Sequence, residues 1–179
     1  MLITSDDYLA NYAKSQQHRG RDLTEKNEIY LYPGRNIRMT EMTAIIGRVQ
    51  LSNLNYYLER RRQIASNYKK SFKDQHNLKV IAPENDLQSS YWKFPILVSK
   101  KIDRDTILNT LNENGIHADA TYTPPLHLQP VFRQLYNIDE NFLPTSEEIM
   151  KRSICLPCHP NISNDEVDYV IKTVKDLLY

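Results

Sequence analysis

Hydrophobic residues between Thr40 and Phe72 recur at steps of three and four positions, which is the period of an amphipathic helix. The series comprises Ile45, Ile46, Val49, Leu54, Tyr57, Leu58, Ile64, Ala65, Tyr68 and Phe72. No proline interrupts it, and Gly47 is the only glycine within it. An unbroken helix over this stretch would be about 50 Å long at ~1.5 Å per residue. We expect such a helix to need cover from another domain, another chain or both.

The chain before this helix is mostly polar. The cluster Thr4–Asp7 has the residue types of a helix N-cap and predicts a first, short helix. Residues 16–28, QQHRGRDLTEKNE, predict a loop, and Pro33-Gly34 predicts a turn.

After residue 76 the pattern changes to short apolar runs bounded by turn-forming residues, which is typical of strands. The predicted strands are LKVIAP (78–83), YWKFPILVS (91–99), HADATYT (117–123) and, as a candidate fourth, ICLP (154–157). PENDLQSS (83–90) predicts a polar loop between the first two.

Helix signals alternate with these strands. Asp103 predicts the start of a helix that ends at Asn114-Gly115, and LHLQPVFRQLY (126–136) predicts a short helix. Two capping boxes are predicted, Thr145 with Glu148 and Ser163 with Glu166. The second begins a helix whose apolar stripe consists of Val167, Val170, Ile171, Val174 and Leu177.

This order of elements predicts an α+β fold, in which a long helix leads into a small, mostly antiparallel sheet covered by helices on one face. We expect three regions along the chain. They are a helix-plus-loop region over 1–39, a long inter-domain helix over 40–75 and a small α+β domain over 76–179.

Composition excludes several classes of function. The chain has 23 basic and 22 acidic residues and a net charge of +1, so we expect neither a nucleic-acid partner nor an anionic membrane partner. It contains no apolar run long enough to span a bilayer. Its start, MLITSDD, lacks the basic and apolar regions of a signal peptide, so we expect a cytoplasmic location.

The stretch CLPCH (155–159) is a candidate functional motif. Cys-x-x-Cys-His is the signature of covalent haem attachment, and Cys-x-x-Cys suggests redox or zinc sites. A structural zinc site normally takes four ligands, and the chain has only two cysteines. Free cysteine is also among the most buried residue types. We therefore favour Cys155 and Cys158 as packing residues and keep a redox or haem site as a weaker alternative.

Four segments, in order, resemble the DegT/DnrJ/EryC1/StrS aminotransferases. They are HRGRD (18–22), PGRNIRMTEMTAIIGRVQLSNLNYYLERRRQIASNY (33–68), NENGIHADATYTPPLHLQPVF (112–132) and LPTSEEIMKRSICLPCHPNISNDEVDYVI (143–171). This family consists of enzymes that depend on pyridoxal 5'-phosphate (PLP) and mostly aminate nucleotide-linked keto-sugars. The resemblance also places CLPCH in a Leu-Pro-x-His-Pro strand and turn, whose flanking positions are small or apolar.

The resemblance implies that the chain corresponds to the C-terminal part of a fold-type I PLP aminotransferase, with residues 1–39 as the edge of the large domain. It implies a Schiff-base lysine that precedes residue 1, so we expect no catalytic residue in this chain and no activity of the chain alone. PLP is expected in the complete enzyme and not on this chain by itself. The expected amino donor is glutamate or glutamine, although a few relatives are dehydratases. The expected partners are a second copy of the chain or the N-terminal PLP domain, and a nucleotide-sugar substrate.

Four residues are the site candidates that the resemblance implies. Asn36 is expected to contact the PLP phosphate of a neighbouring subunit, although from the residues alone it would support the Pro33-Gly34 turn. Arg38 is expected as a buried ion-pair partner, with phosphate or substrate contact as the second interpretation. His127 and Tyr122 are expected to line the cleft for the nucleotide sugar.

His18, Arg19 and Arg21 form a cationic loop that could steer a diphosphate, while exposed arginines are also common without such a role. The alternative to an enzyme is a non-catalytic oligomerisation or regulatory module that uses the apolar stripe of the long helix.

Overall fold

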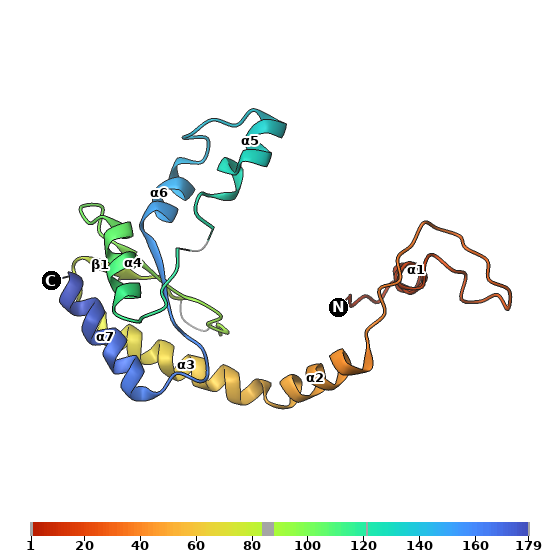
Figure 1. Ribbon diagram of the computed structural model, residues 1–179, viewed down its shortest axis with the longest axis horizontal. Coiled ribbons are helices and arrows are strands. Elements are labelled where there is room, and N and C mark those ends of the chain that lie inside the picture. The colour runs from red at the N-terminus through yellow and green to blue at the C-terminus, as the bar shows by residue number, and fades with distance from the viewer. Residues whose placement is uncertain (1, 84–87, 121, 179) are drawn as a thin grey trace. The chain divides into compact units, whose positions relative to one another are not determined.

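The computed structural model describes residues 2–83, 88–120 and 122–178. The chain forms two units, Met1–Asn53 and Leu54–Tyr179, which we call the N-terminal and C-terminal units and describe separately. Figure 1 shows the elements of both units along the chain.

The N-terminal unit contains two helices joined by a long loop. Helix α1 spans Asp7–Gln17, and its N-cap Asp6 accepts a hydrogen bond from the backbone N–H of Leu9 at 3.0 Å, which confirms the predicted cap cluster. Helix α2 spans Glu41–Ser52, and the side chain of its N-cap Thr40 accepts from the N–H of Thr43 at 3.2 Å. No residue of α2 is buried.

The C-terminal unit is built on a three-stranded antiparallel sheet in the order β1-β2-β3. The strands are β1 Leu78–Val80, β2 Phe94–Val98 and β3 Ser153–Leu156. Leu78 lies opposite Val98, and Phe94 lies opposite Leu156. The register places alternate residues of β2 and β3 on the same face of the sheet.

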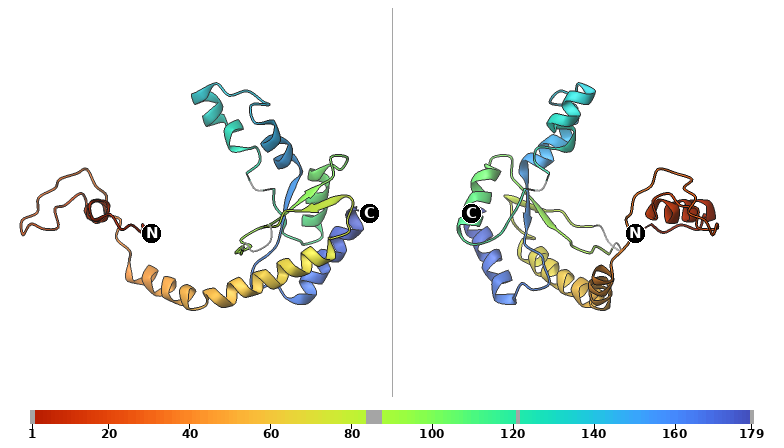
Figure 2. Two further views of the ribbon diagram at one scale, coloured as in Figure 1. Left: turned by 180° about the vertical axis from the view of Figure 1, so that it is seen from behind. Right: turned by 45° about the vertical axis from the view of Figure 1, so that its right-hand side comes forward.

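Three helices cover that face, namely α3 (Leu54–Ser71), α4 (Arg104–Glu113) and α7 (Asn164–Leu178). Helices α3 and α7 contact each other and lie side by side in Figures 1 and 2. The core they share with the sheet includes Ile64, Tyr68, Phe94, Ile96, Val98, Ile107, Leu111, Ile154, Leu156, Val167, Val170 and Val174. The α+β fold with helices on one face of an antiparallel sheet is thus confirmed.

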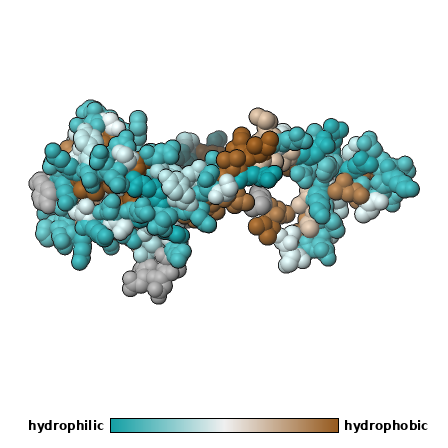
Figure 3. Space-filling view, turned by 90° about the horizontal axis from the view of Figure 1, so that it is seen from below, coloured by the Kyte–Doolittle hydropathy of each residue, from teal (hydrophilic) through white to brown (hydrophobic). Residues whose placement is uncertain are grey.

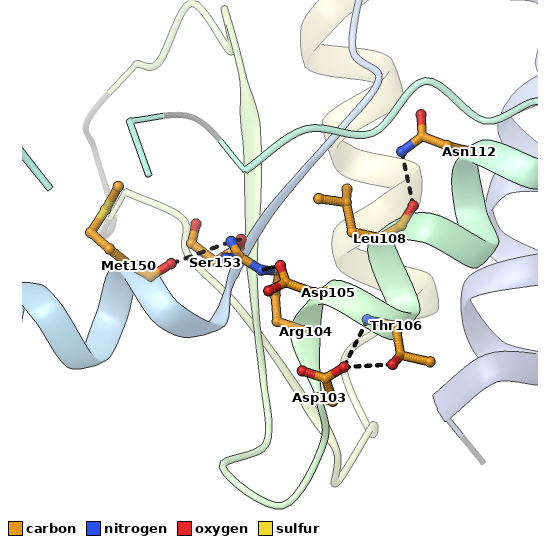
Figure 4. Close-up of polar contacts among 8 residues, drawn as sticks. All are labelled: Asp103, Arg104, Asp105, Thr106, Leu108, Asn112, Met150 and Ser153. Carbon is orange, nitrogen blue, oxygen red and sulfur yellow. Dashed lines mark hydrogen bonds and ion pairs between the residues drawn. The ribbon is translucent and has the colours of Figure 1, made fainter. Parts of the chain in front are cut away.

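The remaining helices are η1 (Leu126–Leu128), α5 (Pro130–Tyr136) and α6 (Pro144–Arg152). The buried side chain of Arg104 connects the start of α4 to the end of α6 and the start of β3 (Figure 4). Its Nη1 donates to the carbonyl of Ser153 at 3.1 Å and to that of Met150 at 3.4 Å, and its Nε donates to Asp105 Oδ1 at 2.6 Å. A buried guanidinium is therefore paired with a carboxylate and with backbone carbonyls.

Local helix signals were predicted well in this unit. Asp103 caps α4 by accepting from the N–H of Thr106 at 3.0 Å, and the helix ends at Glu113 with Asn114 as its C-cap, followed by Gly115 with a φ of 75°. Ser163 and Glu166 form the predicted capping box, with reciprocal hydrogen bonds of 2.7 and 3.2 Å.

The helical stretch expected from Thr40 is present as two helices, because α2 ends at Ser52 and α3 begins at Leu54. The Ser52 hydroxyl and the Asn53 side-chain amide both donate to the carbonyl of Val49, at 2.8 and 3.0 Å. Such side-chain bonds compete with the helical backbone pattern. The predicted region boundaries at residues 40 and 76 stay a prediction.

Two other predictions were wrong. Residues 117–123 do not form a third strand in their described part, since they contribute only an isolated bridge in which Asp119 and Cys155 exchange backbone hydrogen bonds of 3.1 and 2.7 Å. Thr121 and residues 84–87 of the predicted polar loop lie outside the described residues. The other error, the capping box at Thr145, is described below with the site.

None of the helices formed by the described residues combines the length and apolar character that a bilayer span requires.

Candidate functional site

In the N-terminal unit, the cationic loop after α1 pairs with the chain segment that leads to α2. His18 and Asn36 form an antiparallel bridge, and Arg21 and Tyr30 form another. Around the first bridge, the N–H of Arg19 donates to the carbonyl of Arg35 at 3.0 Å. The loop and the segment carrying Asn36 are therefore one hydrogen-bonded piece.

Two glycines allow this pairing. Gly20 has a φ of 80°, and a Cβ there would overlap the backbone carbonyl of Tyr32. A Cβ at Gly34 would overlap the backbone nitrogen of Gly20. The two backbones approach each other so closely that only residues without a side chain fit, and this contact sets where the following residues lie.

Asn36 and Arg38 are brought together by a side-chain hydrogen bond. Arg38 Nε donates to Asn36 Oδ1 at 2.9 Å. Arg38 is exposed, so the expectation of a buried ion-pair partner was wrong. The reason is that its guanidinium lies at the surface of the N-terminal unit, where it pairs with a neutral amide.

This pair fits the phosphate of the expected cofactor by the chemistry of its donors. The bond to Arg38 uses the amide oxygen of Asn36, which leaves the amide N–H groups to donate, and the guanidinium retains further N–H donors and a positive charge. Arg38 and Lys14 both line a groove of this unit, which also includes Thr40, the N-cap of α2. Cations and N–H donors beside a helix start suit an anion.

In the C-terminal unit, His127 lies in η1 and its side chain is largely buried. Its Nε2 is 3.1 Å from Oε1 of Glu147, which is buried at the start of α6. Glu147 also accepts hydrogen bonds from the backbone N–H groups of Asn141 at 3.0 Å and Leu143 at 3.1 Å. The N–H of Asn141, the imidazole of His127 and the N–H of Leu143 together lower the pKa of the Glu147 carboxyl, so this side chain is an anion at neutral pH.

Glu147, the partner of His127, is not among the residues that the sequence suggests for this position. The predicted capping box paired Thr145 with Glu148, but α6 begins at Pro144 and its N-cap is Leu143, which has no side-chain cap. Glu148 instead accepts from Arg152 at 3.0 Å. Pro144 is the sequence signal for the true start of α6, because proline favours the first position of a helix. A helix that begins at Pro144 has Glu147 in its first turn.

Tyr122 is mostly exposed and has a φ of 62°, an uncommon conformation for a residue with a side chain. It lies five positions before His127 in the same unit. The structure thus brings His127 to Glu147 and Asn36 to Arg38, each pair within one unit.

The CLPCH stretch is part of the packing of the C-terminal unit. Cys158 belongs to the hydrophobic core, where burial raises the pKa of its thiol to about 11, and its Sγ lies 3.7 Å from the carbonyl of Arg61. A neutral thiol is a poor metal ligand and nucleophile. Cys155 is half-buried on β3. In the part of the chain that the structure describes, no three His, Cys, Asp or Glu side chains are placed to hold a metal ion.

The profile of the DegT/DnrJ/EryC1/StrS aminotransferase family matches residues 1–175. Similar curated proteins include a pleiotropic regulatory protein of Geobacillus stearothermophilus, at 30% identity over 98% of this chain and 46% of that protein. They also include the GDP-perosamine synthase of Escherichia coli O157:H7, at 28% identity over 98% of this chain and 46% of that protein.

Among solved structures, the chain is similar to PseC of Helicobacter pylori, an aminotransferase involved in the biosynthesis of pseudoaminic acid. The TM-score is 0.88 at 26% identity, over 98% of this chain and 47% of that chain. The chain thus spans about half the length of the relatives it matches.

Proposed function

The chain belongs to the DegT/DnrJ/EryC1/StrS aminotransferase family, and from this premise we propose that it acts as the C-terminal portion of a PLP-dependent aminotransferase. The proposed reaction moves an amino group from glutamate or glutamine to a nucleotide-linked keto-sugar. The observation that carries this proposal is the family match over residues 1–175. Two similar proteins are a dTDP-4-amino-4,6-dideoxy-D-glucose transaminase of Shigella dysenteriae and the GDP-perosamine synthase, and their names support the same class of substrate here.

Within this enzyme, Asn36 and Arg38 hold the phosphate of the cofactor through N–H donors and positive charge. PLP, when bound, supplies an electron sink for the carbon that loses or gains the amino group. His127 and Tyr122 contact the nucleotide sugar. The contact between the two glycines keeps Asn36 and Arg38 in place before the cofactor arrives, so little ordering is needed on binding.

None of the residues named here is proposed as catalytic. Transamination needs an amine that binds the cofactor covalently and then moves a proton, and we propose that this lysine lies outside these 179 residues. The 179-residue chain alone is therefore proposed to be inactive. A cytoplasmic location and a partner that is either a second copy or the N-terminal PLP domain are parts of the same proposal.

The test mixes the chain with the N-terminal portion of a relative that carries the lysine. We expect the mixture, but neither component alone, to show PLP absorbance, a lysine labelled by PLP after borohydride treatment, and transamination of a keto-sugar nucleotide. Asn36→Ala should weaken PLP binding by the mixture, whereas Asn27→Ala, in the same loop, is the matched control. Turnover by the unaided chain would contradict the proposal.

A second candidate function, a non-catalytic association module, is favoured by the surface of α2. Five of its hydrophobic residues, Met42, Ile45, Ile46, Val49 and Leu51, are each more than half exposed, and Figure 3 shows hydrophobic side chains gathered over this helix. Exposed apolar patches of this kind mark interaction sites. Sedimentation of the isolated chain tests this candidate, and a single monomeric species across concentrations would exclude it.

A further inference from the structure

The carboxylate of Glu147 is held by three donors, two from the turn before α6 and one from η1. The two backbone N–H groups, of Asn141 and Leu143, come from the turn before α6 and do not depend on His127. The third donor is the His127 ring. The side chain of Glu147 is only 5% exposed, so solvent does not offer it other partners.

The turn that carries His127 is fixed as well. The N–H groups of Leu128 and Gln129 donate to the carbonyls of Pro125 and Leu126, at 2.9 and 3.1 Å. The side chain of Gln129 donates to the carbonyl of Pro124 at 2.9 Å. The backbones of His127 and Glu147 are thus each held by other hydrogen bonds. The 3.1 Å contact between their side chains therefore forms between two fixed segments.

An ionised carboxylate can only accept hydrogen bonds, so the ring nitrogen facing it must carry the proton. In neutral histidine one ring nitrogen is a donor and the other an acceptor. With a proton on Nε2, the neutral ring has its lone pair on Nδ1.

We propose that Glu147 is a positioning residue for His127, which keeps the proton on Nε2 and so makes Nδ1 the atom that exchanges hydrogen bonds with the substrate. A neutral His127 then accepts a hydrogen bond through Nδ1 from a hydroxyl group, of which a sugar offers several. This inference rests on the proposed function, in which His127 contacts the nucleotide sugar. The inference adds that Nδ1 of His127 makes the contact with the sugar and that Glu147 determines this choice of atom.

The test measures the ring nitrogens of His127 by NMR in the complete 179-residue chain labelled with ¹⁵N-histidine. The signals of His127 are assigned by their loss in His127→Asn. We expect the Nε2–H form of the neutral ring to exceed the Nδ1–H form by about tenfold or more, because hydrogen bonds to charged acceptors are the stronger ones. A ring with its proton mainly on Nδ1 would overturn the proposal.

Two variants separate positioning from general stability. In Glu147→Ala the excess of the Nε2–H form should fall severalfold, whereas Glu148→Ala, in the next position of α6, should leave it unchanged. Amide spectra of the sheet residues report whether each variant is folded. A folded Glu147→Ala chain with the unchanged ratio would overturn the proposal, and if this variant does not fold, the ratio in the unaltered chain decides.

A last measurement separates this inference from the proposed function. UDP-glucose is added to the chain combined with the lysine-bearing N-terminal portion, and a shift of the His127 Nδ1 signal is expected. If the ring is in the Nε2–H form but no shift follows, the proposed substrate contact of His127 is wrong, and with it the role of Nδ1 toward a sugar. If a shift occurs with the ring in the Nδ1–H form, the substrate contact stands and the positioning role of Glu147 is wrong.

Discussion

In α2, the apolar residues Ile45, Ile46 and Val49 are more than half exposed, whereas in α7 Val167, Val170 and Val174 are at most 3% exposed. Both helices carry these residues at helical spacing, and both begin with a hydroxyl residue that caps the helix. The difference between them is what lies against the apolar face. Helix α7 packs on α3 and α4, while no residue of α2 is buried within the N-terminal unit.

This comparison shows that periodicity predicts an apolar face but not whether the chain itself covers it. The C-terminal unit contains the sheet and helices that bury one another and can account for its own stability. The N-terminal unit, in its described residues, buries only Ser15 and Gly20, so its hydrophobic residues remain available to other surfaces. Substitutions in matched pairs, one in each unit, should therefore have very different effects.

The largest difference is expected for apolar residues. Phe94→Ala should lower the free energy of unfolding of the C-terminal unit by about 3–5 kcal/mol, because it leaves a cavity in the core. Ile46→Ala, on the exposed face of α2, should change it by less than ~0.5 kcal/mol. Urea unfolding followed by the fluorescence of Trp92, the only tryptophan of the chain, reports on the C-terminal unit. Equal losses in the two variants would contradict the comparison.

A smaller difference is expected for arginines. Arg104→Ala should destabilise the C-terminal unit by about 1–3 kcal/mol, because the partly buried carbonyls of Met150 and Ser153 lose their donor. Arg48→Ala, on the exposed surface of α2, is the control and should have no measurable effect on the same transition. An Arg104 variant as stable as this control would show that the carbonyls find other donors.

Helix caps give a closely matched pair. Ser163 and Thr40 each accept a hydrogen bond of 3.2 Å from a backbone N–H three residues later, at Glu166 and Thr43. Ser163→Ala should lower the free energy of unfolding reported by Trp92 by about 1 kcal/mol. Thr40→Ala should leave that transition unchanged, because α2 does not contribute to the core of the C-terminal unit. A similar loss in both variants would mean that the two units unfold together.

The smallest effect on stability, but a clear effect on association, is expected for the face of α2. Ile45→Ser combined with Val49→Ser should leave the Trp92 transition within ~0.5 kcal/mol of its original position. The same variant should associate more weakly in sedimentation, because it removes apolar surface that a partner would bury. Tyr56→Ser, an exposed position on α3, serves as the control. Unaltered association in the double variant would show that this face is not where the chain self-associates.

Features governed by neighbouring residues in the sequence could be predicted. The caps at Asp6, Asp103 and Ser163 follow from side chains that reach a backbone N–H three residues away. The break at Asn53 was also encoded locally, since Ser52 and Asn53 both bond to the carbonyl of Val49. The apolar series continues past these two polar residues, although both residue types favour helix ends.

Features that depend on distant partners could not be predicted. The residues 117–123 have strand-forming composition, but pairing needs a neighbour in register, and in their described part only Asp119 meets one, at Cys155. The contact between Glu147 and His127 likewise joins residues that lie twenty positions apart in the sequence. The resemblance suggested His127 as a site residue, but nothing in the sequence said which carboxylate would meet its ring.

The contact between Gly20 and Gly34 has a consequence for attempts to alter this protein by random mutagenesis. Even alanine, the most modest replacement, would collide with a backbone that has no rotamer by which to move aside. Libraries built around this loop should therefore return glycine at both positions, while the neighbouring positions accept other residues. Substitutions in that loop should therefore be made at positions other than Gly20 and Gly34.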